Sequence, residues 1–212
     1  GFVNGLRRTG EKTSEVVDGV LHNQINRSLV ESILTTGGIG AQLSGKKILR
    51  AEKLWSTDPK TGEKLDIGFV GRILAVNVAP ILDALNFRII PVVTPLAQDF
   101  HGQAYNVNAD TTACEIAKAL HARKLVFLSD VPGILRDQKD ESSLISMIRT
   151  TDVPDLVKEG VLSGGMLPKV QSCVDAIESG VSEVHMVDGR IPHSLLLEIF
   201  TAKGVGTQIL KG

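Results

Sequence analysis

Residues 105–135 read YNVNADTTACEIAKALHARKLVFLSDVPGIL, and this stretch decides the fold. The segment from Ala109 to Leu120 repeats apolar side chains at helical spacing, which predicts a helix. The segment from Lys124 to Leu128 is a short apolar run without polar alternation, which is typical of a strand buried on both faces. A polar turn, Ser129 to Gly133, follows that strand directly. Because ligands bind at the carboxyl ends of strands in open parallel sheets, this turn is a candidate binding site.

Outside this stretch, strands alternate with helices toward both ends of the chain. Further helices are expected over residues 13–36, 78–85, 151–160, 167–179 and 195–200. Further strands are expected over residues 40–43, 88–94, 184–187 and 206–210, with a hairpin formed by residues 47–54 and 65–73. This alternation implies parallel βαβ units and an α/β fold, a three-layer α/β/α sandwich around a mainly parallel sheet. A boundary between residues 1–97 and 98–212 separates the part with the hairpin from a more regular α/β part.

The composition excludes several classes of protein. A net charge of −1 over 212 residues argues against a nucleic-acid surface, because phosphate binding needs clustered lysine and arginine. No apolar run approaches the length of a membrane span. Cys114 and Cys173 fall on apolar helical faces, so we expect core residues in a reducing, cytoplasmic setting and no disulfide. The sequence also contains no P-loop, no dinucleotide fingerprint and no Cys/His cluster with metal spacing, and no metal site is predicted.

Three polar residues, Asn106, Asn108 and Asp110, lie within five positions at the start of the predicted helix. An asparagine side chain donates and accepts together, so such residues can hold a carboxylate or an amide in a fixed pose. The alternative is that they only cap the helix. Their number, and the second polar turn after the next strand, favour a site.

Lys169 follows the glycine pair Gly164-Gly165 at the start of another predicted helix. A lysine there is opposed by the helix dipole, and an anion bound at the helix start relieves that repulsion. Backbone amides of a helix start and an ammonium group together make a phosphate site. The alternative is a solvated surface lysine, but the two glycines allow close backbone approach and favour phosphate.

Two further features carry less information by themselves. The turn from Asp130 to Leu135 suits a nucleotide ribose or phosphate, and an ordinary β-turn around Pro132 and Gly133 explains it equally well. The planar guanidinium of Arg7 is suited to a carboxylate, although a lone arginine there is typical of a surface charge.

Taken together, these motifs resemble the amino-acid kinase family, and within it the members that phosphorylate N-acetyl-L-glutamate. The resemblance covers nearly the whole chain. It is carried by FVNGLR (2–7), LSG (43–45), GFVG (68–71), YNVNAD (105–110), LSDVPGIL (128–135), GGMLPK (164–169), HSLLLEIFT (193–201) and GVGT (204–207).

The resemblance implies the amino-acid kinase fold and transfer of phosphate from ATP to the side-chain carboxylate of N-acetyl-L-glutamate, a step of arginine biosynthesis. Residues 1–97 would belong to the acceptor-substrate lobe and residues 98–212 to the nucleotide-binding lobe. The acceptor would be bound by Arg7, Asn106 and Asn108. Asp110 would orient the catalytic lysines, and Lys169 would stabilise the transferring phosphoryl group. ATP, carrying Mg²⁺ on its phosphates, would be held by Asp130, Val131, Gly133, Ile134, Leu135, Val161, Leu162, Ser163, Gly164 and Gly165.

The carboxyl-terminal pattern resembles that of the family members inhibited by L-arginine. A buried Glu198 carboxylate could pair with an arginine guanidinium, and His193 and Gly206 complete the predicted allosteric site. The resemblance also implies a homodimer or a hexamer, and it makes a PII-type regulator a candidate partner.

The sequence departs from the family at its start. Family members open with a strand ending in Lys-Gly-Gly, then a helix and a second strand, and this segment is missing from the 212 residues. We therefore expect an active parent enzyme and an inactive fragment, because removal of transition-state donors costs orders of magnitude in rate. The alternative is a non-catalytic module of the same fold that senses arginine or nucleotide. A sibling kinase for aspartate, glutamate or UMP is a third reading.

Overall fold

The structure, a computed structural model, describes residues 2–3, 6–7, 9–58, 61–201 and 204–212, without the side chains of residues 2, 3, 6, 7, 11, 12, 14 and 15. Contacts divide the chain into two compact units, Gly1–Thr112 and Ala113–Gly212. The sequence placed a boundary between residues 97 and 98, but the contacts place it after Thr112. The difference arises because β7 (Leu96–Gln98) and β8 (Ala104–Asn106) pair with the strands of the hairpin in the first unit.

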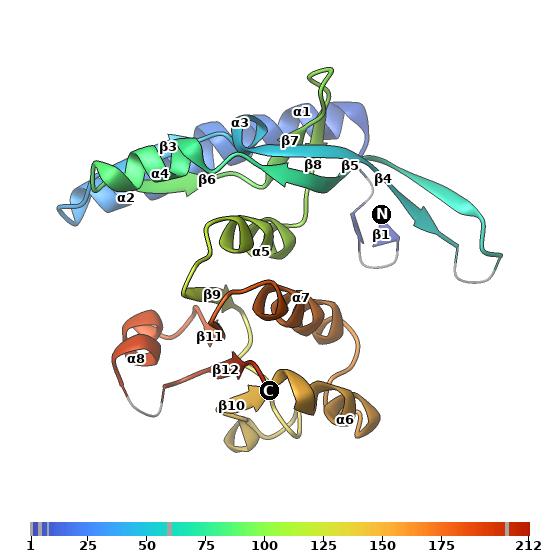
Figure 1. The fold of residues 1–212 in the computed structure, drawn as a ribbon, viewed down its shortest axis with the longest axis vertical. Helices are drawn as coiled ribbons and strands as arrows, with labels where there is room; N and C mark the ends of the chain where they lie inside the picture. Colours follow the sequence, from blue (N-terminus) through green and yellow to red (C-terminus); the bar gives the residue numbers. More distant parts are fainter. Residues whose placement is uncertain (1, 4–5, 8, 59–60, 202–203) are drawn as a thin grey trace. The chain divides into compact units, whose positions relative to one another are not determined.

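The first unit begins with a short antiparallel pair, β1 (Phe2–Val3) and β2 (Leu6–Arg7). The predicted helix over residues 13–36 is confirmed, as α1 (Glu11–Val20), a π-helical turn η1 (Leu21–Asn26) and α2 (Arg27–Thr35). In Figure 1, α2 lies beside β3 (Gly40–Leu43), which pairs in parallel with β6 (Ile90–Val93). The short helices α3 (Gly45–Ile48) and α4 (Ala79–Asn86) complete this part.

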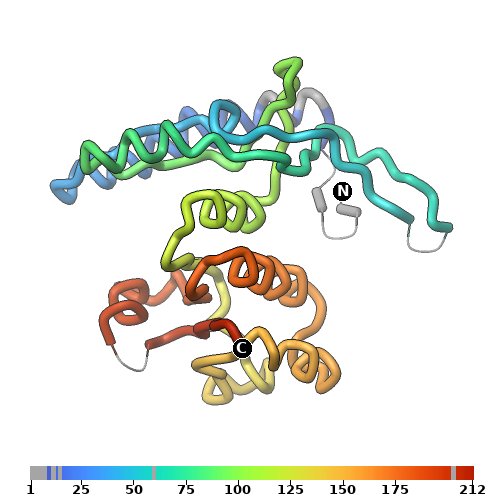
Figure 2. The backbone as a smooth tube through the Cα atoms, viewed as in Figure 1, coloured from blue at the N-terminus to red at the C-terminus, as the bar shows by residue number. Residues whose placement is uncertain are grey.

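The predicted hairpin is confirmed and is longer than expected, with β4 (Leu49–Thr57) antiparallel to β5 (Lys64–Val76). Figure 2 shows the two strands continuing side by side as a long two-stranded arm. Their other ends close a small barrel with β7 and β8, in the order β4-β5-β8-β7. In this barrel Val70 of β5 lies opposite Asn106 of β8. The barrel therefore fixes the backbone that leads into the Asn106–Asp110 segment.

The helix α5 (Ala109–Ala119) runs from the first unit into the second, where it leads to β9 (Lys124–Ser129). The second unit contains a four-stranded sheet in the order β10-β12-β11-β9, formed by β10 (Met147–Arg149), β12 (Thr207–Leu210), β11 (Glu183–Asp188) and β9. The pairs β9/β11 and β10/β12 are parallel, and β11/β12 is antiparallel. The predicted α/β class is confirmed, with one antiparallel pairing in this sheet.

The remaining helices of the second unit flank this sheet. They are η2 (Glu141–Ser143), η3 (Thr150–Asp152), α6 (Val153–Lys158), α7 (Met166–Glu178) and α8 (Ser194–Phe200). The face of α7 that carries Val170, Cys173 and Ile177 is buried, as its helical spacing predicted. Cys114 is buried too, and both cysteines belong to the hydrophobic core. Because β9 and β11 are parallel and in register, Ser129 and Asp188 end side by side at one edge of the sheet.

Candidate functional site

A cavity of about 550 Å³ in the second unit opens at that edge of the sheet. Its lining comes from the turn after β9 (residues 130–135), from Val161 and residues 163–166 at the start of α7, and from Gln138, Glu141 and Arg190. The structure thus brings together every residue of the predicted nucleotide set except Leu162. That side chain is 1% exposed and packs in the hydrophobic core behind the cavity.

The turn after β9 is held in place by Thr207 of β12. The Thr207 hydroxyl accepts a hydrogen bond from the Ile134 amide at 2.9 Å and donates one to the Ile145 carbonyl at 2.7 Å. Gly133 passes so close that an added Cβ would lie 2.6 Å from Thr207 Oγ1, and its φ of 140° is rarely adopted by residues with side chains. The glycine is therefore required by the contact between this turn and β12. An ordinary surface turn would not need it.

The start of α7 lines the cavity and has no side-chain cap, and the amide of its first residue, Met166, donates to the Ser163 carbonyl at 3.3 Å. The N-cap residue Gly165 provides no side-chain hydrogen bond, and no atom lies within 4 Å of where its Cβ would be. One turn later, the Lys169 ammonium approaches the Ser129 hydroxyl, with Nζ 3.4 Å from Oγ. Uncapped helix amides and a nearby cation form an anion-binding arrangement. These contacts place Lys169 next to the turn after β9, as the phosphate hypothesis requires.

A second cation at this edge was not predicted. Arg190 lines the cavity and forms a bidentate pair with Asp188, from Nε to Oδ1 at 2.9 Å and from Nη2 to Oδ2 at 2.8 Å. This hydrogen bonding lowers the pKa of the Asp188 carboxyl and raises the pKa of the Arg190 guanidinium. The sequence signal was present, because Asp-Gly-Arg follows an apolar strand just as Ser-Asp follows β9.

The predicted acceptor residues belong to the first unit. Asn106 ends β8, and Asn108 Oδ1 accepts a hydrogen bond from the Thr111 amide at 3.0 Å. Asn108 therefore acts as a cap for α5, the alternative that the sequence left open, while Asp110 lies in the first turn of that helix. The side chain of Arg7 lies outside the described residues.

The predicted allosteric residues near the carboxyl terminus are brought together only in part. Glu198 is 7% exposed, and its Oε2 atom accepts hydrogen bonds from the amides of Val205 and Gly206 at 2.7 and 2.9 Å. His193 is exposed at the N-cap of α8, and no contact joins it to Glu198 in the described part of the chain. The histidine that contacts Glu198 is His185 of β11, with Nδ1 2.7 Å from Oε1.

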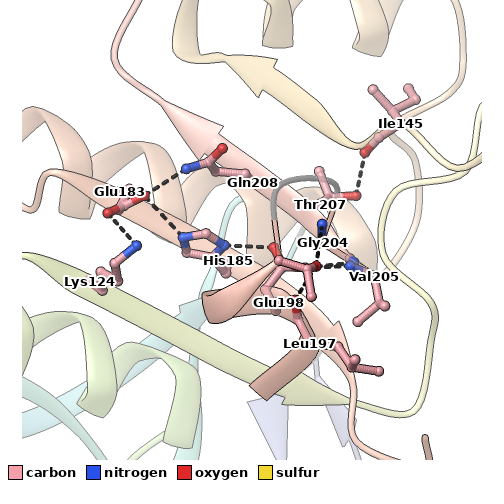
Figure 3. Close-up of polar contacts among 12 residues, drawn as sticks. Lys124, Ile145, Glu183, His185, Leu197, Glu198, Gly204, Val205, Thr207 and Gln208 are labelled. Atoms are coloured by element: carbon pink, nitrogen blue, oxygen red, sulfur yellow. Dashed lines mark hydrogen bonds and ion pairs between the residues drawn. The ribbon is translucent and has the colours of Figure 1, made fainter. Parts of the chain in front are cut away.

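His185 was missed because it lies inside a buried strand, where no motif marks it. It is 3% exposed, and its Nε2 atom lies 3.2 Å from Glu183, which also contacts Lys124 and Gln208 (Figure 3). Burial alone would raise the pKa of Glu198. The contacts with His185 and with the two amides outweigh burial and hold that pKa below its usual value. The pKa of Glu183 is lowered against burial in the same way, by Lys124, Gln208 and His185.

The carboxylates of the cavity determine what kind of metal site is available. Asp130 and Glu141 supply the hard oxygen donors that Mg²⁺ prefers. Within the described residues, no group of three or more His, Cys, Asp or Glu side chains is arranged to hold a metal ion. Two carboxylates of this kind suit a magnesium ion that also takes ligands from a bound phosphate compound. No helix in the described part of the chain is long and apolar enough to cross a bilayer.

Comparison with known proteins identifies the family. The model of the amino acid kinase family matches residues 2–188. The chain is 48% identical to the acetylglutamate kinase of Heliobacterium modesticaldum over 215 residues, which covers 99% of this chain and 73% of that protein. It is also 48% identical to the acetylglutamate kinase of Carboxydothermus hydrogenoformans over 212 residues, which covers 98% of this chain and 72% of that protein.

A solved structure supports the same fold. The N-acetylglutamate synthase of Neisseria gonorrhoeae, complexed with coenzyme A and N-acetyl-glutamate, superposes with a TM-score of 0.83 at 26% identity. The match covers the whole of this chain and 47% of that one. The likeness agrees with the three-layer α/β/α fold predicted from the sequence.

Proposed function

This chain belongs to the amino acid kinase family, and we propose that it transfers the terminal phosphoryl group of ATP to the side-chain carboxylate of N-acetyl-L-glutamate. The observation that carries the proposal is the cavity of the second unit, which is lined by a glycine-containing turn and by a helix start without a side-chain cap. Lys169 lies beside Ser129, the residue that precedes this turn. The relatives named above favour a kinase over the non-catalytic sensing module.

The reaction requires alignment and charge neutralisation more than covalent help from the protein. An oxygen of the acceptor carboxylate attacks the terminal phosphorus, the bond to the leaving ADP oxygen breaks, and an acyl phosphate forms. Lys169 stabilises the negative charge on the transferring group, and Asp110 has the orienting role that the family resemblance implies. Arg7, Asn106 and Asn108 bind the acceptor. Of these, Asn108 has the weakest support, since its side chain already caps α5.

The nucleotide lies along the turn after β9, with its phosphates toward the start of α7. Magnesium supplies additional charge neutralisation when it is bound to those phosphates. Asp130 and Glu141 are the protein carboxylates that would face it, either directly or through water. The first unit then serves as the acceptor-substrate lobe and the second as the nucleotide-binding lobe.

The test is an assay of the protein expressed from its complete reading frame, with ATP, Mg²⁺ and a panel of acceptors. We expect ADP release and a hydroxylamine-trappable acyl phosphate with N-acetyl-L-glutamate, and neither product with L-glutamate, L-aspartate or UMP. Turnover of one of those other acceptors in place of N-acetyl-L-glutamate would assign the chain to a sibling kinase and contradict the proposal.

L-Arginine is proposed as a feedback inhibitor that binds at Glu198. The support is a carboxylate that is buried, kept ionised and surrounded by the backbone amides of residues 205 and 206. Calorimetric titration should show that the wild type binds L-arginine. Glu198→Gln should weaken this binding by about tenfold or more, which corresponds to the loss of one charge-assisted hydrogen bond. His193→Ala, at the exposed N-cap of α8, should bind arginine like the wild type. Equal binding by the Glu198→Gln protein and the wild type would contradict this assignment.

Three further properties follow from the family resemblance alone. The protein is proposed to assemble as a homodimer or hexamer, to act in the cytoplasm, and to be open to control by a PII-type regulator. Sedimentation of the purified protein, with and without arginine, tests the assembly.

A further inference from the structure

The turn after β11 presents a guanidinium group that is fixed in position. Asp188 is 4% exposed, so its carboxylate is almost wholly withdrawn from water. It accepts hydrogen bonds from the amide and from Nε of Arg190 through Oδ1, and from Nη2 through Oδ2. A bidentate pair of this kind fixes the plane of the guanidinium as well as its position. The Arg190 side chain is still 62% exposed, so one edge of the group faces outward.

Arg190 lines an acidic cavity. Arg190 is the one lysine or arginine among the cavity-lining residues that the structure describes, and the lining also contains Asp130 and Glu141. Nη1 of Arg190 donates to no residue in the described part of the chain. A polyphosphate that enters between two carboxylates needs positive charge close by, and Arg190 can supply it without moving its backbone.

Arg190 and Lys169 approach the same segment from different elements. Lys169 reaches the Ser129 hydroxyl from α7. On the β11 side, the Gly189 amide donates to the Ser129 carbonyl at 2.8 Å, which fixes the residue next to Arg190. Lys169 and the residue that precedes Arg190 therefore both contact Ser129, which begins the candidate phosphate-binding turn. Lys169 is explained by the transfer reaction, but Arg190 has no role in the reaction as described above.

We propose that Arg190 is a nucleotide-binding residue that donates hydrogen bonds from its outward edge to the phosphates of the nucleotide. Asp188 acts as a positioning residue that holds the guanidinium in the plane needed for this contact. The inference rests on the proposed function, since it requires that the cavity of the second unit takes a nucleotide.

The test is calorimetric titration of the 212-residue chain with ADP, AMP and adenosine, the last by competition against ADP. Arg190→Gln should weaken ADP binding by about tenfold or more, the equivalent of one lost charge-assisted hydrogen bond. The same variant should bind adenosine with an affinity within about twofold of the wild-type value, because adenosine carries no phosphate for Arg190 to contact. A change of about twofold is well below the strength of one hydrogen bond. Arg190→Lys keeps the positive charge but lacks the paired N–H donors of the guanidinium. This variant should therefore lose an intermediate amount of ADP affinity.

Arg136→Gln is the matched control. The Arg136 side chain is also 62% exposed and pairs with a carboxylate, Glu159, but it does not line the cavity. Its replacement should leave binding of both ADP and adenosine unchanged. An equal loss in both arginine variants would assign the effect to net charge and overturn the proposal.

A variant that lacks the guanidinium leaves the buried Asp188 carboxylate without its main partner, and this could reduce folding. The double variant Asp188→Asn with Arg190→Gln removes that charge and should also bind ADP weakly while retaining wild-type affinity for adenosine. Full ADP affinity in either Arg190→Gln protein overturns the inference, and so does an equal loss of ADP and adenosine. Failure of the wild-type chain to bind ADP would count against the proposed function itself.

Discussion

Lys169 lies at a helix start, where the surrounding backbone opposes a positive charge. A lysine in the first turn of a helix is opposed by the helix dipole, and the Gly164-Gly165 pair before it provides no side-chain cap. The contact between Nζ and Ser129 Oγ directs the ammonium toward the turn after β9. A surface lysine would have no reason to be held there. The geometry therefore favours a charge that serves the transferring phosphoryl group.

In the protein expressed from the complete reading frame, Lys169→Met should lower kcat by about 10²–10³-fold, the usual effect of removing one donor that acts on the transition state. ADP affinity should change much less, because the charge is needed most while the phosphoryl group is in transfer. Lys158→Met is the control, since Lys158 is 77% exposed and pairs with Asp155 on the surface. A kcat in the Lys169→Met protein equal to that of the control would contradict the assigned role.

At the scale of elements, the turn after β9 depends on β12, which lies far along the chain. Thr207 of β12 accepts from the Ile134 amide, and Gly133 leaves no room for a side chain beside that hydroxyl. The shape of the turn is thus set by a strand distant in sequence, since 73 positions separate Ile134 from Thr207. Residue preferences in the turn alone could not distinguish it from an ordinary β-turn.

Gly133→Ala should lower the free energy of unfolding by about 2–3 kcal/mol, through backbone strain and a clash with Thr207, and should weaken ADP binding as well. Gly160→Ala separates the two causes. Gly160 has a φ of 76° and no atom within 4 Å of the position that an added Cβ would take, so only strain of about 1–2 kcal/mol is expected there. Denaturant unfolding and ADP titration of both variants provide the measurements. Equal stability losses, with ADP binding intact in both, would show that the contact with Thr207 is unimportant.

At the scale of the whole second unit, a buried polar network links elements that are distant in sequence. Both ring nitrogens of His185 lie within hydrogen-bonding distance of carboxylate oxygens, Nδ1 near Glu198 and Nε2 near Glu183. Glu183 connects this group to β9 through Lys124 and to β12 through Gln208 (Figure 3). The network therefore joins β9, β11, β12 and α8.

This network makes stability depend on pH in a definite direction. The pKa values of Glu183 and Glu198 are lower in the folded protein than their ordinary values. Their contribution is therefore fully present above the unfolded pKa of about 4.3, and it is lost as the pH falls below that value through the folded pKa. Wild-type unfolding free energy, measured with urea between about pH 7 and about pH 3, should fall steeply below about pH 4.5.

Glu198→Gln should be less stable than the wild type at neutral pH, and the difference should shrink as the pH is lowered through the acidic range. Glu159→Gln, which changes an exposed carboxylate paired with Arg136, should follow the wild-type curve. A constant difference between Glu198→Gln and the wild type at every pH would mean that the carboxylate charge is not responsible.

The sequence by itself determined the α/β class, the position of most helices and strands, and most of the cavity lining. It did so because apolar periodicity and turn residues report local structure, and because the strand–turn–helix order places polar turns at strand ends. The turn from Asp130 to Leu135, the pair Gly164-Gly165 and Lys169 were singled out for this reason, and the family resemblance added Val161 and Ser163. Only the tertiary structure decided that Arg190 joins them, that Asn108 caps a helix, and that His185 rather than His193 contacts Glu198. These choices depend on which strands pair and in what register, and pairing energy between distant segments leaves no local pattern in the chain.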